Sequence, residues 1–424
     1  MEQFVINGGV PLNGTLTPSG NKNAALPILA ACLLTEEPII LHNIPKIGDV
    51  ITLKQILQNL GVRVEEQNDN TWVVHAKSIV GHTPDTDLCR HIRASILLAG
   101  PMLARHGQLK LPPPGGDVIG RRRLDTHILA LEALGCKIEG TNPFKLTANT
   151  LIGADILLDE ASVTATENAV MASVLAKGTT TLRNAASEPH VQELCHFLNS
   201  IGARISGIGS NMLTIEGVNA LSGGEHTIGP DYLEVVSFIG AAAVTRGQIR
   251  IKDSAANYLK MAELVFARLG ISWETDDGDI LVPNNQTLKI IPDLNDVIPK
   301  VDDAPWPGFP ADMMSIAIVV ATQCDGTVLF HEKLFESRLH FVDKLIGMGA
   351  QIIMCDPHRC IVQGPTQLQA ETLESPDIRA GMALLIAALC AKGESIIRNI
   401  NQIERGYEGV DHKLRSLGAH INRV

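Results

Sequence analysis

Two stretches of the chain concentrate groups that can bind anions. The first is the loop at residues 18–23, P-S-G-N-K-N, which leads into an apolar run of helix-forming residues. At such a junction, free backbone N–H groups and the positive end of the helix dipole attract an anion, and Lys22 adds a full charge. The loop therefore predicts an anion-binding helix N-terminus, with a plain helix cap as the alternative.

The second stretch is residues 111–127, L-P-P-P-G-G-D-V-I-G-R-R-R-L-D-T-H. It contains three prolines, three glycines and three consecutive arginines. A Gly/Pro-rich insertion with clustered charge is typical of a mobile loop over a binding site. We expect residues 112–123 to form such a loop, with an ordinary solvated loop as the alternative.

Three aspartates stand where apolar helices are expected to begin. Asp231, Asp312 and Asp377 each follow a proline by one or two residues. Proline at a helix start with an acid in the first turn is good capping chemistry, so capping is the simplest interpretation. If the helices lie inside a barrel, however, their N-termini converge at one end. Arg93 and Glu167 are expected to begin two further helices of this kind.

These groups belong to a unit that occurs six times along the chain. Each copy has an apolar helix rich in small residues, a turn, a strand, and then an amphipathic helix followed by glycine and a second strand. A glycine just past a helix is the left-handed C-cap, and such regular repetition indicates a repeat architecture. The glycines that close the copies are Gly61, Gly135, Gly202, Gly270, Gly349 and Gly418.

The apolar helices predict the fold class. They are hydrophobic on nearly every side, so they should be fully buried, and their alanine, glycine and serine residues allow close backbone approach. Buried helices surrounded by strand-bearing units indicate α/β barrels with the helices inside and the sheets outside. Three copies precede residue 228 and three follow it. Ordinary α/β units without higher symmetry are the alternative.

Composition limits the function classes. The 424-residue chain is 45% hydrophobic, and no apolar run reaches the ~18 residues that span a membrane. The first residues lack a basic segment followed by an apolar one, so we expect a cytoplasmic protein. The net charge of −11 argues against a nucleic-acid partner. The spacing of Cys355, His358 and Cys360 matches no usual zinc pattern, and we expect neither a metal nor a cofactor.

Several motifs together resemble one family of enzymes. They are S-G-N-K-N-A-A-L-P, R-A-S-I, L-P-x-x-G-G-x-x-I-G-x-R, E-A-S-V, N-A-A-S-E-P-H, F-P-A-D-M, F-E-S-R, D-I-R-A and E-R-G-Y-E. In this combination the chain resembles the UDP-N-acetylglucosamine 1-carboxyvinyltransferases, which are enolpyruvyl transferases. The resemblance extends over residues 4–423.

The resemblance implies a fold and a reaction. The fold is two inside-out α/β barrels of three repeats each, with residues 21–228 in the first and residues 1–20 and 229–424 in the second. The reaction joins phosphoenolpyruvate to the 3′-hydroxyl of UDP-N-acetylglucosamine through a tetrahedral ketal and releases phosphate. It begins the synthesis of peptidoglycan precursors. The implied partners are these two small substrates, and a monomer is expected.

The resemblance also implies site residues. Arginine suits the clamp on phosphoenolpyruvate because its planar fork binds carboxylate or phosphate through two bonds. The implied phosphoenolpyruvate residues are Lys22, Asn23, Arg122, Arg338, Arg379 and Arg405. Those implied for the nucleotide sugar are Asn23, Arg93, Arg122, Arg123, Leu124, Asp125, Thr126, Ser162, Val163, Asp312 and Leu334. The implied catalytic residues are Lys22, Asp117, Asp312 and Arg405, with Asp312 as the base on the 3′-hydroxyl.

One departure from the family pattern bears on activity. Asp117 occupies the loop position where most members carry a reactive cysteine, which the epoxide fosfomycin alkylates. A carboxylate is a far weaker nucleophile toward an epoxide than a thiolate, so we expect insensitivity to fosfomycin. Two other functions stay open at this point: a non-catalytic paralogue that binds a UDP-sugar, and an enolpyruvyl transferase with a different acceptor.

Overall fold

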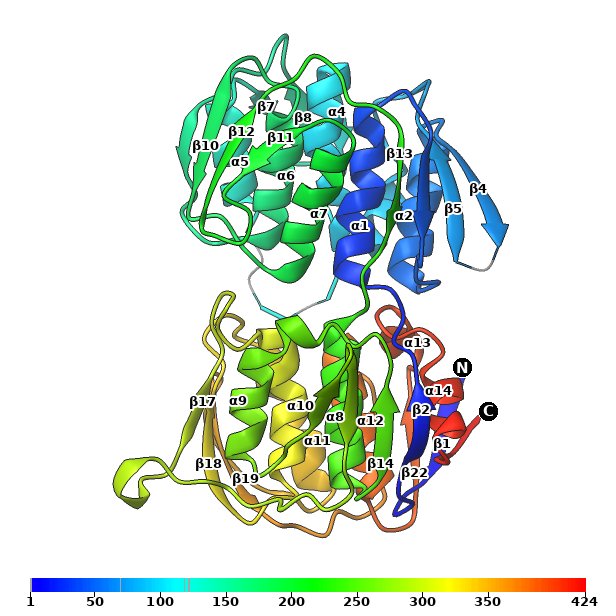
Figure 1. The fold of residues 1–424 in the computed structure, drawn as a ribbon, viewed down its shortest axis with the longest axis vertical. Coiled ribbons are helices and arrows are strands. Elements are labelled where there is room, and N and C mark those ends of the chain that lie inside the picture. The colour runs from blue at the N-terminus through cyan, green and yellow to red at the C-terminus, as the bar shows by residue number, and fades with distance from the viewer. Residues whose placement is uncertain (1, 69, 118, 121–122) are drawn as a thin grey trace. The chain divides into compact units, whose positions relative to one another are not determined.

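The computed structural model describes residues 2–68, 70–117, 119–120 and 123–424, and these form two compact units. One unit contains residues 2–19, 119–120 and 230–424, and the other contains the described residues of 20–117 and 123–229. Figure 1 shows that each consists of helices and sheets. The barrel boundaries expected from the sequence stay a prediction, because compactness alone does not show which residues fold independently.

The unit with both chain termini has three four-stranded sheets in its described residues. The first sheet has the order β21-β22-β1-β23, the second β15-β16-β14-β2 and the third β17-β18-β20-β19. Their strands are β1 Gln3–Asn7, β2 Asn13–Leu16, β14 Gln248–Ile251, β15 Glu274–Asp276, β16 Asp279–Val282, β17 Lys300–Asp302, β18 Gly326–His331, β19 Gln351–Asp356, β20 Arg359–Gly364, β21 Thr372–Glu374, β22 Glu394–Arg398 and β23 His420–Arg423. β1 is antiparallel to both β22 and β23, so the first strand of the chain lies between two of the last.

The other unit repeats this pattern. Its described residues form two four-stranded sheets, β11-β12-β10-β9 and β13-β3-β5-β4, and one three-stranded sheet, β6-β8-β7. Their strands are β3 Ile39–His42, β4 Arg63–Asn68, β5 Thr71–His75, β6 Gln108–Leu111, β7 Lys137–Glu139, β8 Phe144–Thr147, β9 Asp155–Leu157, β10 Thr179–Arg183, β11 Arg204–Ser206, β12 Met212–Glu216 and β13 Gly224–Thr227. Parallel and antiparallel pairs mix within a sheet: β10 is parallel to β9 and antiparallel to β12.

Each unit is built around buried helices. α8 (Tyr232–Val244), α10 (Ala311–Ala321) and α12 (Ile378–Cys390) pack against one another in the first unit. α1 (Lys22–Ala31), α4 (Ala99–His106) and α6 (Val163–Ser173) lie in the second. All thirteen residues of α8 are buried, as a helix that is apolar on every side requires. The structure confirms the mixed α/β class and the burial of the small-residue helices.

Amphipathic helices complete the repeats, and each of the six expected glycines follows one with a positive φ, between 75° and 108°. These helices are α2 Gly48–Asn59, α5 Asp125–Ala133, α7 Pro189–Ser200, α9 Lys260–Arg268, α11 Val342–Gly347 and α14 Val410–Ser416. The shorter helices are η1 Cys32–Leu34, α3 Thr86–His91, η2 Arg93–Leu98, η3 Ala256–Tyr258, η4 Leu294–Asp296, η5 Arg338–Phe341 and α13 Asn401–Glu404. The left-handed C-caps predicted from the sequence are therefore confirmed.

Two expected helix starts differ in the structure. The second buried helix begins at Arg93, but its first turn is the 3₁₀ helix η2, and α4 follows directly. The third was expected to begin at Glu167, which is wrong. α6 begins at Val163 because the Ser162 side chain caps it, accepting a hydrogen bond from the Ala165 N–H. Glu167 lies inside the helix and is fully buried.

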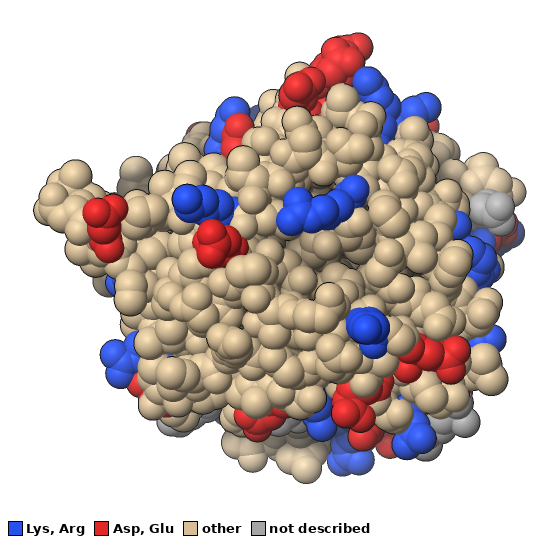
Figure 2. Space-filling model, turned by 90° about the horizontal axis from the view of Figure 1, so that it is seen from below, with Lys and Arg blue, Asp and Glu red and all other residues tan. Residues whose placement is uncertain are grey.

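The surface carries charges of both signs. On the face that Figure 2 shows, lysine and arginine side chains alternate with aspartate and glutamate among uncharged residues. The described residues of this face do not form the continuous basic stripe typical of nucleic-acid-binding surfaces. None of the helices in the described part of the chain combines the length and the apolar character needed to cross a membrane.

Close packing of the buried helices makes a stability prediction. A Cβ at Gly240 in α8 would lie 3.0 Å from Ile316 Cγ2 and 3.1 Å from Val320 Cγ2, both on α10. We expect Gly240→Val to destabilise the protein by about 1–3 kcal/mol through overpacking. Gly347→Ala in α11 is the control, because a Cβ there meets nothing within 4 Å. It should be neutral or stabilising by up to about 1 kcal/mol. Urea unfolding midpoints test both, and an unchanged midpoint for Gly240→Val would contradict the packing argument.

Candidate functional site

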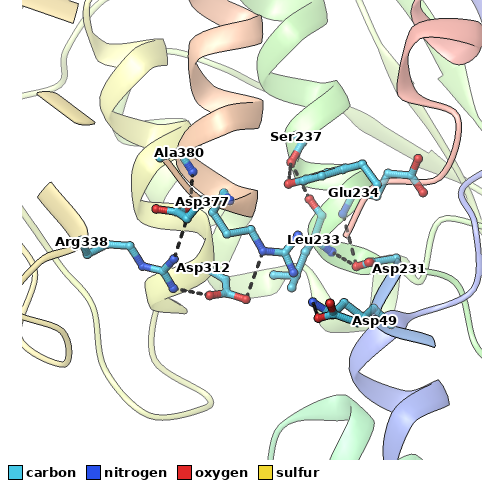
Figure 3. Close-up of polar contacts among 12 residues, drawn as sticks. Asp49, Asp231, Leu233, Glu234, Ser237, Asp312, Arg338, Asp377 and Ala380 are labelled. Atoms are coloured by element: carbon cyan, nitrogen blue, oxygen red, sulfur yellow. Dashed lines mark hydrogen bonds and ion pairs between the residues drawn. The ribbon is translucent and has the colours of Figure 1, made fainter. Parts of the chain in front are cut away.

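Asp312 is held by two arginines from other elements of its unit. It is the second residue of α10, and Arg338, which begins η5, donates from Nη2 to Asp312 Oδ1 at 2.5 Å. Arg379 in α12 donates from Nε to Asp312 Oδ2 at 3.2 Å. Figure 3 shows the carboxylate of Asp312 joined to Arg338 by a dashed line. Three residues that the sequence resemblance assigned to the site therefore lie in one cluster.

The two arginines have donors to spare for a further anion. Their side chains are only 4% and 5% exposed, whereas that of Asp312 is 31% exposed. Arg338 Nε and Arg379 Nη1 are buried and have no hydrogen-bond partner in the described part of the chain. A buried unpaired donor on a cation is costly, which favours occupancy by a ligand carboxylate or phosphate.

The surroundings of Arg379 keep it charged. Its guanidinium lies 5.3 Å from the ring centroid of Tyr407, a cation–π distance. Burial by itself would lower the pKa of Arg379, but Tyr407, Asp312 and Asp231 outweigh it and raise this pKa above its ordinary value. Burial also raises the pKa of Asp231, against the opposing effect of Arg379. The cluster therefore keeps a permanent cation with little solvent around it.

The aspartates at the helix starts divide into two kinds. Asp231 accepts hydrogen bonds from the N–H groups of Leu233 and Glu234, and Asp377 accepts from those of Arg379 and Ala380, so both cap their helices. Pro310 occupies the N-cap position of α10, and no side-chain cap is made there. The capping interpretation holds for Asp231 and Asp377, whereas the carboxylate of Asp312 serves the two arginines.

Lys22 belongs to the other unit and already has an acidic partner. Its Nζ lies 2.6 Å from Asp49 Oδ2, and the two side chains are 10% and 8% exposed. Lys22 is the first residue of α1, where Asn21 caps the helix by accepting from the Ala24 N–H. A cation at the positive end of a helix is unfavourable by itself. The Asp49 carboxylate offsets that cost.

Four residues expected to bind the nucleotide sugar lie around Asp159. Arg123 Nη2 donates to Asp159 Oδ2 at 3.0 Å, and the hydroxyl of Thr126 donates to Asp159 Oδ1 at 2.6 Å. Arg93 Nη2 donates to the carbonyl of Arg123 at 3.0 Å. The Asp125 carboxylate lies 3.9 Å from Arg123 Nε. The start of α5 and the start of η2 are joined by these contacts.

The other expected residues occupy separate places in the two units. Asn23 is half-buried in α1, Leu124 precedes α5, and Ser162 with Val163 begins α6. Leu334 follows β18 with 43% of its surface exposed. Arg405 follows α13 and donates to Gln402 Oε1 at 2.9 Å. Asp117 is half-buried, and Arg122 lies outside the described residues.

Three residues of these networks were missed by the site prediction. Asp49 pairs with Lys22, Asp159 joins Arg123 to Thr126, and Tyr407 stacks on Arg379. Tyr407 stands inside the motif E-R-G-Y-E, and Asp159 directly precedes E-A-S-V, so both had a motif beside them. Asp49 follows N-I-P-K-I-G, and its spacing from Lys22 does not indicate that the two residues form a pair.

His127 in α5 forms a buried network beside Thr126. Asn168 in α6 accepts from the Gly100 N–H and donates to the Ile96 carbonyl, which fixes the orientation of its amide. Its NH₂ group therefore faces His127 Nδ1 at 2.9 Å, so Nδ1 must be the acceptor. His127 Nε2 carries the hydrogen and donates to Thr164 Oγ1 at 3.1 Å. Burial and, secondarily, Arg93 lower the pKa of His127 to about 3.

Comparison with known proteins places the chain among carboxyvinyltransferases. Residues 6–414 match the model of the EPSP synthase (3-phosphoshikimate 1-carboxyvinyltransferase) family. The UDP-N-acetylglucosamine 1-carboxyvinyltransferase of Treponema denticola is 58% identical over 421 residues, 99% of each chain. The protein of the same name from Bradyrhizobium diazoefficiens is 56% identical over 422 residues, 100% of this chain and 98% of that one.

Solved structures share the fold at lower identity. The enolpyruvyl transferase NikO from Streptomyces tendae has a TM-score of 0.88 and 24% identity, over 100% of this chain and 99% of that one. EPSP synthase from Acinetobacter baumannii has a TM-score of 0.76 and 17% identity over 100% of both chains. These two likenesses establish the enolpyruvyl transferase fold.

The neutral state of His127 predicts a loss of stability in acid. In the unfolded chain the imidazole titrates near pH 6.5, so below that pH the unfolded state binds a proton that the folded state excludes. The stability that the neutral imidazole contributes to the folded state is fully present above about pH 6.5. Below that pH it falls by up to about 1.4 kcal/mol per pH unit, toward the folded pKa of about 3.

Unfolding midpoints between about pH 7 and pH 4 test this expectation. His127→Gln should lose less stability on acidification than the wild type, although it should be less stable at neutral pH. His196→Gln is the control, because His196 is an exposed residue of α7 in the same unit. Parallel pH curves for His127→Gln and the wild type would refute the assigned neutral state of His127.

Proposed function

The chain belongs to the UDP-N-acetylglucosamine 1-carboxyvinyltransferase family, and from that premise we propose that it transfers the enolpyruvyl group of phosphoenolpyruvate to the 3′-hydroxyl of UDP-N-acetylglucosamine. Phosphate is the second product, and the reaction opens peptidoglycan precursor synthesis. The proposal includes a cytoplasmic location and a monomeric protein. The structural observation that carries it is the Asp312 carboxylate bonded to two buried arginines with spare donors.

The chemistry needs cations for phosphoenolpyruvate. This small substrate carries a carboxylate and a phosphate on neighbouring atoms, and a planar guanidinium binds either group through two bonds. Arg338 and Arg379 supply such groups on rigid, buried elements. In the proposal, Arg122, Arg405 and Lys22 provide the remaining charge.

The chemistry also needs a base for the acceptor hydroxyl. In the proposal, Asp312 accepts the proton of the 3′-hydroxyl as its oxygen attacks C2 of phosphoenolpyruvate. C3 of phosphoenolpyruvate receives a proton in the same addition step, which forms the tetrahedral ketal. Loss of a proton from C3 and of phosphate from C2 then gives the enol ether. The two arginine bonds hold both oxygens of Asp312 in place, which limits its motion before the hydroxyl arrives.

The nucleotide sugar is assigned to the second unit. Arg93, Arg123 and Thr126 are linked through Asp159 and a backbone carbonyl, so they form a preformed polar surface. Ser162 and Val163 lie at the start of α6, where N–H groups without helical partners suit phosphate oxygens. We assign the diphosphate and uridine to these residues.

The alternatives have less support. A UDP-sugar-binding paralogue would have no need of cations for phosphoenolpyruvate, yet the buried arginine pair is present. A different acceptor is less favoured because relatives with 58% and 56% identity over the full chain are named for UDP-N-acetylglucosamine. Phosphate release from phosphoenolpyruvate, measured with and without UDP-N-acetylglucosamine, decides between these functions. Release that does not depend on this acceptor, or no release at all, would contradict the proposal.

Removing single cations should disable turnover and leave the fold intact. Losing one charged hydrogen bond costs about 1.5–3 kcal/mol, or about 10- to 150-fold in kcat/KM. We expect losses of this size in Lys22→Ala, Arg122→Ala and Arg405→Ala. Lys392→Ala is the control, because Lys392 is an exposed lysine. Steady-state kinetics with circular dichroism test this, and wild-type kcat/KM in all three variants would exclude these residues from the site.

The residue at position 117 should decide the response to fosfomycin. We expect the unmodified protein to stay active in its presence, because a carboxylate opens an epoxide far more slowly than a thiolate. Asp117→Cys should become sensitive, with a covalent adduct in which the thiolate sulfur has opened the ring. Asp117→Ala controls for loss of the carboxylate alone. Intact-mass spectra check the adduct, and rapid labelling of the unmodified protein at Asp117 would refute the expectation.

A further inference from the structure

Two fully buried carboxyl groups lie side by side at the ends of two parallel strands. β17 pairs with β18 in parallel, with Asp302 opposite His331, so the next residues, Asp303 and Glu332, leave the sheet at the same edge. Both residues are 0% exposed. Two adjacent buried carboxylates repel each other and lack water, so this arrangement requires compensation.

The hydrogen bonds distinguish the two groups. Both oxygens of Asp303 accept backbone N–H groups: Oδ1 accepts that of Lys333, and Oδ2 accepts that of Leu334 at 3.2 Å. Asp303 therefore has the bonding of an ionised carboxylate. Glu332 Oε1 accepts the N–H of Phe335 at 3.2 Å, whereas Glu332 Oε2 is buried and has no partner among the described residues. Glu332 Oε2 can form a hydrogen bond to the neighbouring Asp303 carboxylate only if it carries a proton.

We propose that Glu332 carries a proton on Oε2 and donates it in a hydrogen bond to Asp303, and that this neutral–anionic pair positions the turn 333–335 and, through it, Arg338. The pair contributes three bonds to backbone N–H groups of consecutive residues. η5 begins three residues later with Arg338, which donates to Asp312. Glu332 is thus a positioning residue, and its relation to catalysis rests on the proposed function.

The charged groups around Glu332 agree with this protonation state. Burial first, and Asp303 second, raise the pKa of Glu332 to about 9, while Arg338 and the Phe335 N–H oppose the rise. Lys333 Nζ bonds Asp302 Oδ2 at 2.9 Å. His358, from the turn between β19 and β20, bonds the backbone carbonyl of Glu332 at 2.7 Å. Lys333 Nζ and His358 Nδ1 therefore bond groups other than the Glu332 carboxyl.

Deprotonation of Glu332 would place a second buried negative charge beside Asp303. The raised pKa means that the folded state keeps a proton that the unfolded chain releases near pH 4.5. Stability contributed by this proton is full below that pH and is lost as the pH rises toward about 9. The bonds that hold the turn should then weaken, and Arg338 should lose its fixed place at Asp312.

Infrared spectroscopy tests the proton without any enzymatic reaction. At pH 7 the difference between the wild-type spectrum and that of Glu332→Gln should contain the C=O band of one neutral carboxylic acid, shifted when the protein is made with ¹³C-labelled glutamate. The subtraction removes the contribution of Glu167, whose pKa burial also raises. This difference band should disappear as the pH passes about 9. Glu374→Gln, an exposed glutamate on β21, is the control and should keep the band. A difference spectrum without a neutral-acid band overturns the proposal.

Two variants separate the roles of the pair. A glutamine at position 332 reproduces the neutral acid, because its NH₂ can donate to Asp303 while its oxygen accepts from Phe335. We expect Glu332→Gln to keep kcat/KM within about twofold at pH 7. Asp303→Asn replaces one acceptor by a donor that faces a backbone N–H, so kcat/KM should fall about tenfold or more.

The pH profile completes the test. Wild-type kcat/KM should fall as the pH rises through about 9, and this decrease should be missing in Glu332→Gln. Equal losses in Glu332→Gln and Asp303→Asn at pH 7, or identical alkaline limbs in Glu332→Gln and wild type, would overturn the positioning role. An error in the proposed function can be distinguished from an error in the positioning role. If the protein does not catalyse the proposed reaction, the wild type and all variants should show no turnover, while the infrared band should be unchanged.

Discussion

The constraint on which the structure depends is that its central helices have no polar face. Every residue of α8 is buried, and so is every residue of α12 except the last, and the charged residues of these two helices lie near the helix starts. There, backbone N–H groups without helical partners and the helix dipole stabilise carboxylates. Asp231, Asp312 and Asp377 all occupy such ends within one unit, and Arg379 lies in the first turn of α12. The packing rule of the fold therefore determines where the polar chemistry lies.

Much of the fold could be predicted from the sequence because the repeats carry strong local signals. Glycine after a helix and alternating apolar residues in the next strand specify each repeat through backbone geometry alone, and all six glycines adopt the expected left-handed conformation. Helix starts were harder to predict. The start of α6 depends on the Ser162 cap rather than on the charge of Glu167. η2 is a 3₁₀ helix that no sequence pattern indicated.

The site was predictable to the extent that motifs mark it. Asp312, Arg338 and Arg379 come from three motifs and meet in one cluster. Their partners were not predictable in the same way, because pairing such as Lys22 with Asp49 depends on how α1 and α2 pack against each other. Glu332 is the extreme case. Its proposed protonation depends on Asp303, which follows another strand, and on an oxygen that has no partner among the described residues, a fact that appears only in three dimensions.

The central position of β1 in its sheet affects how the chain can be made on the ribosome. Asn7 pairs with Glu394, which is 387 residues later in the chain, and β1 also pairs with β23 at the C-terminus. At a synthesis rate of about 5–20 residues per second, about 20–80 seconds pass between the synthesis of β1 and that of β22, its first pairing partner. Residues 20–229 are complete long before that moment. The unit with both termini is therefore the last to close, and during translation the nascent chain carries a strand with two unpaired edges.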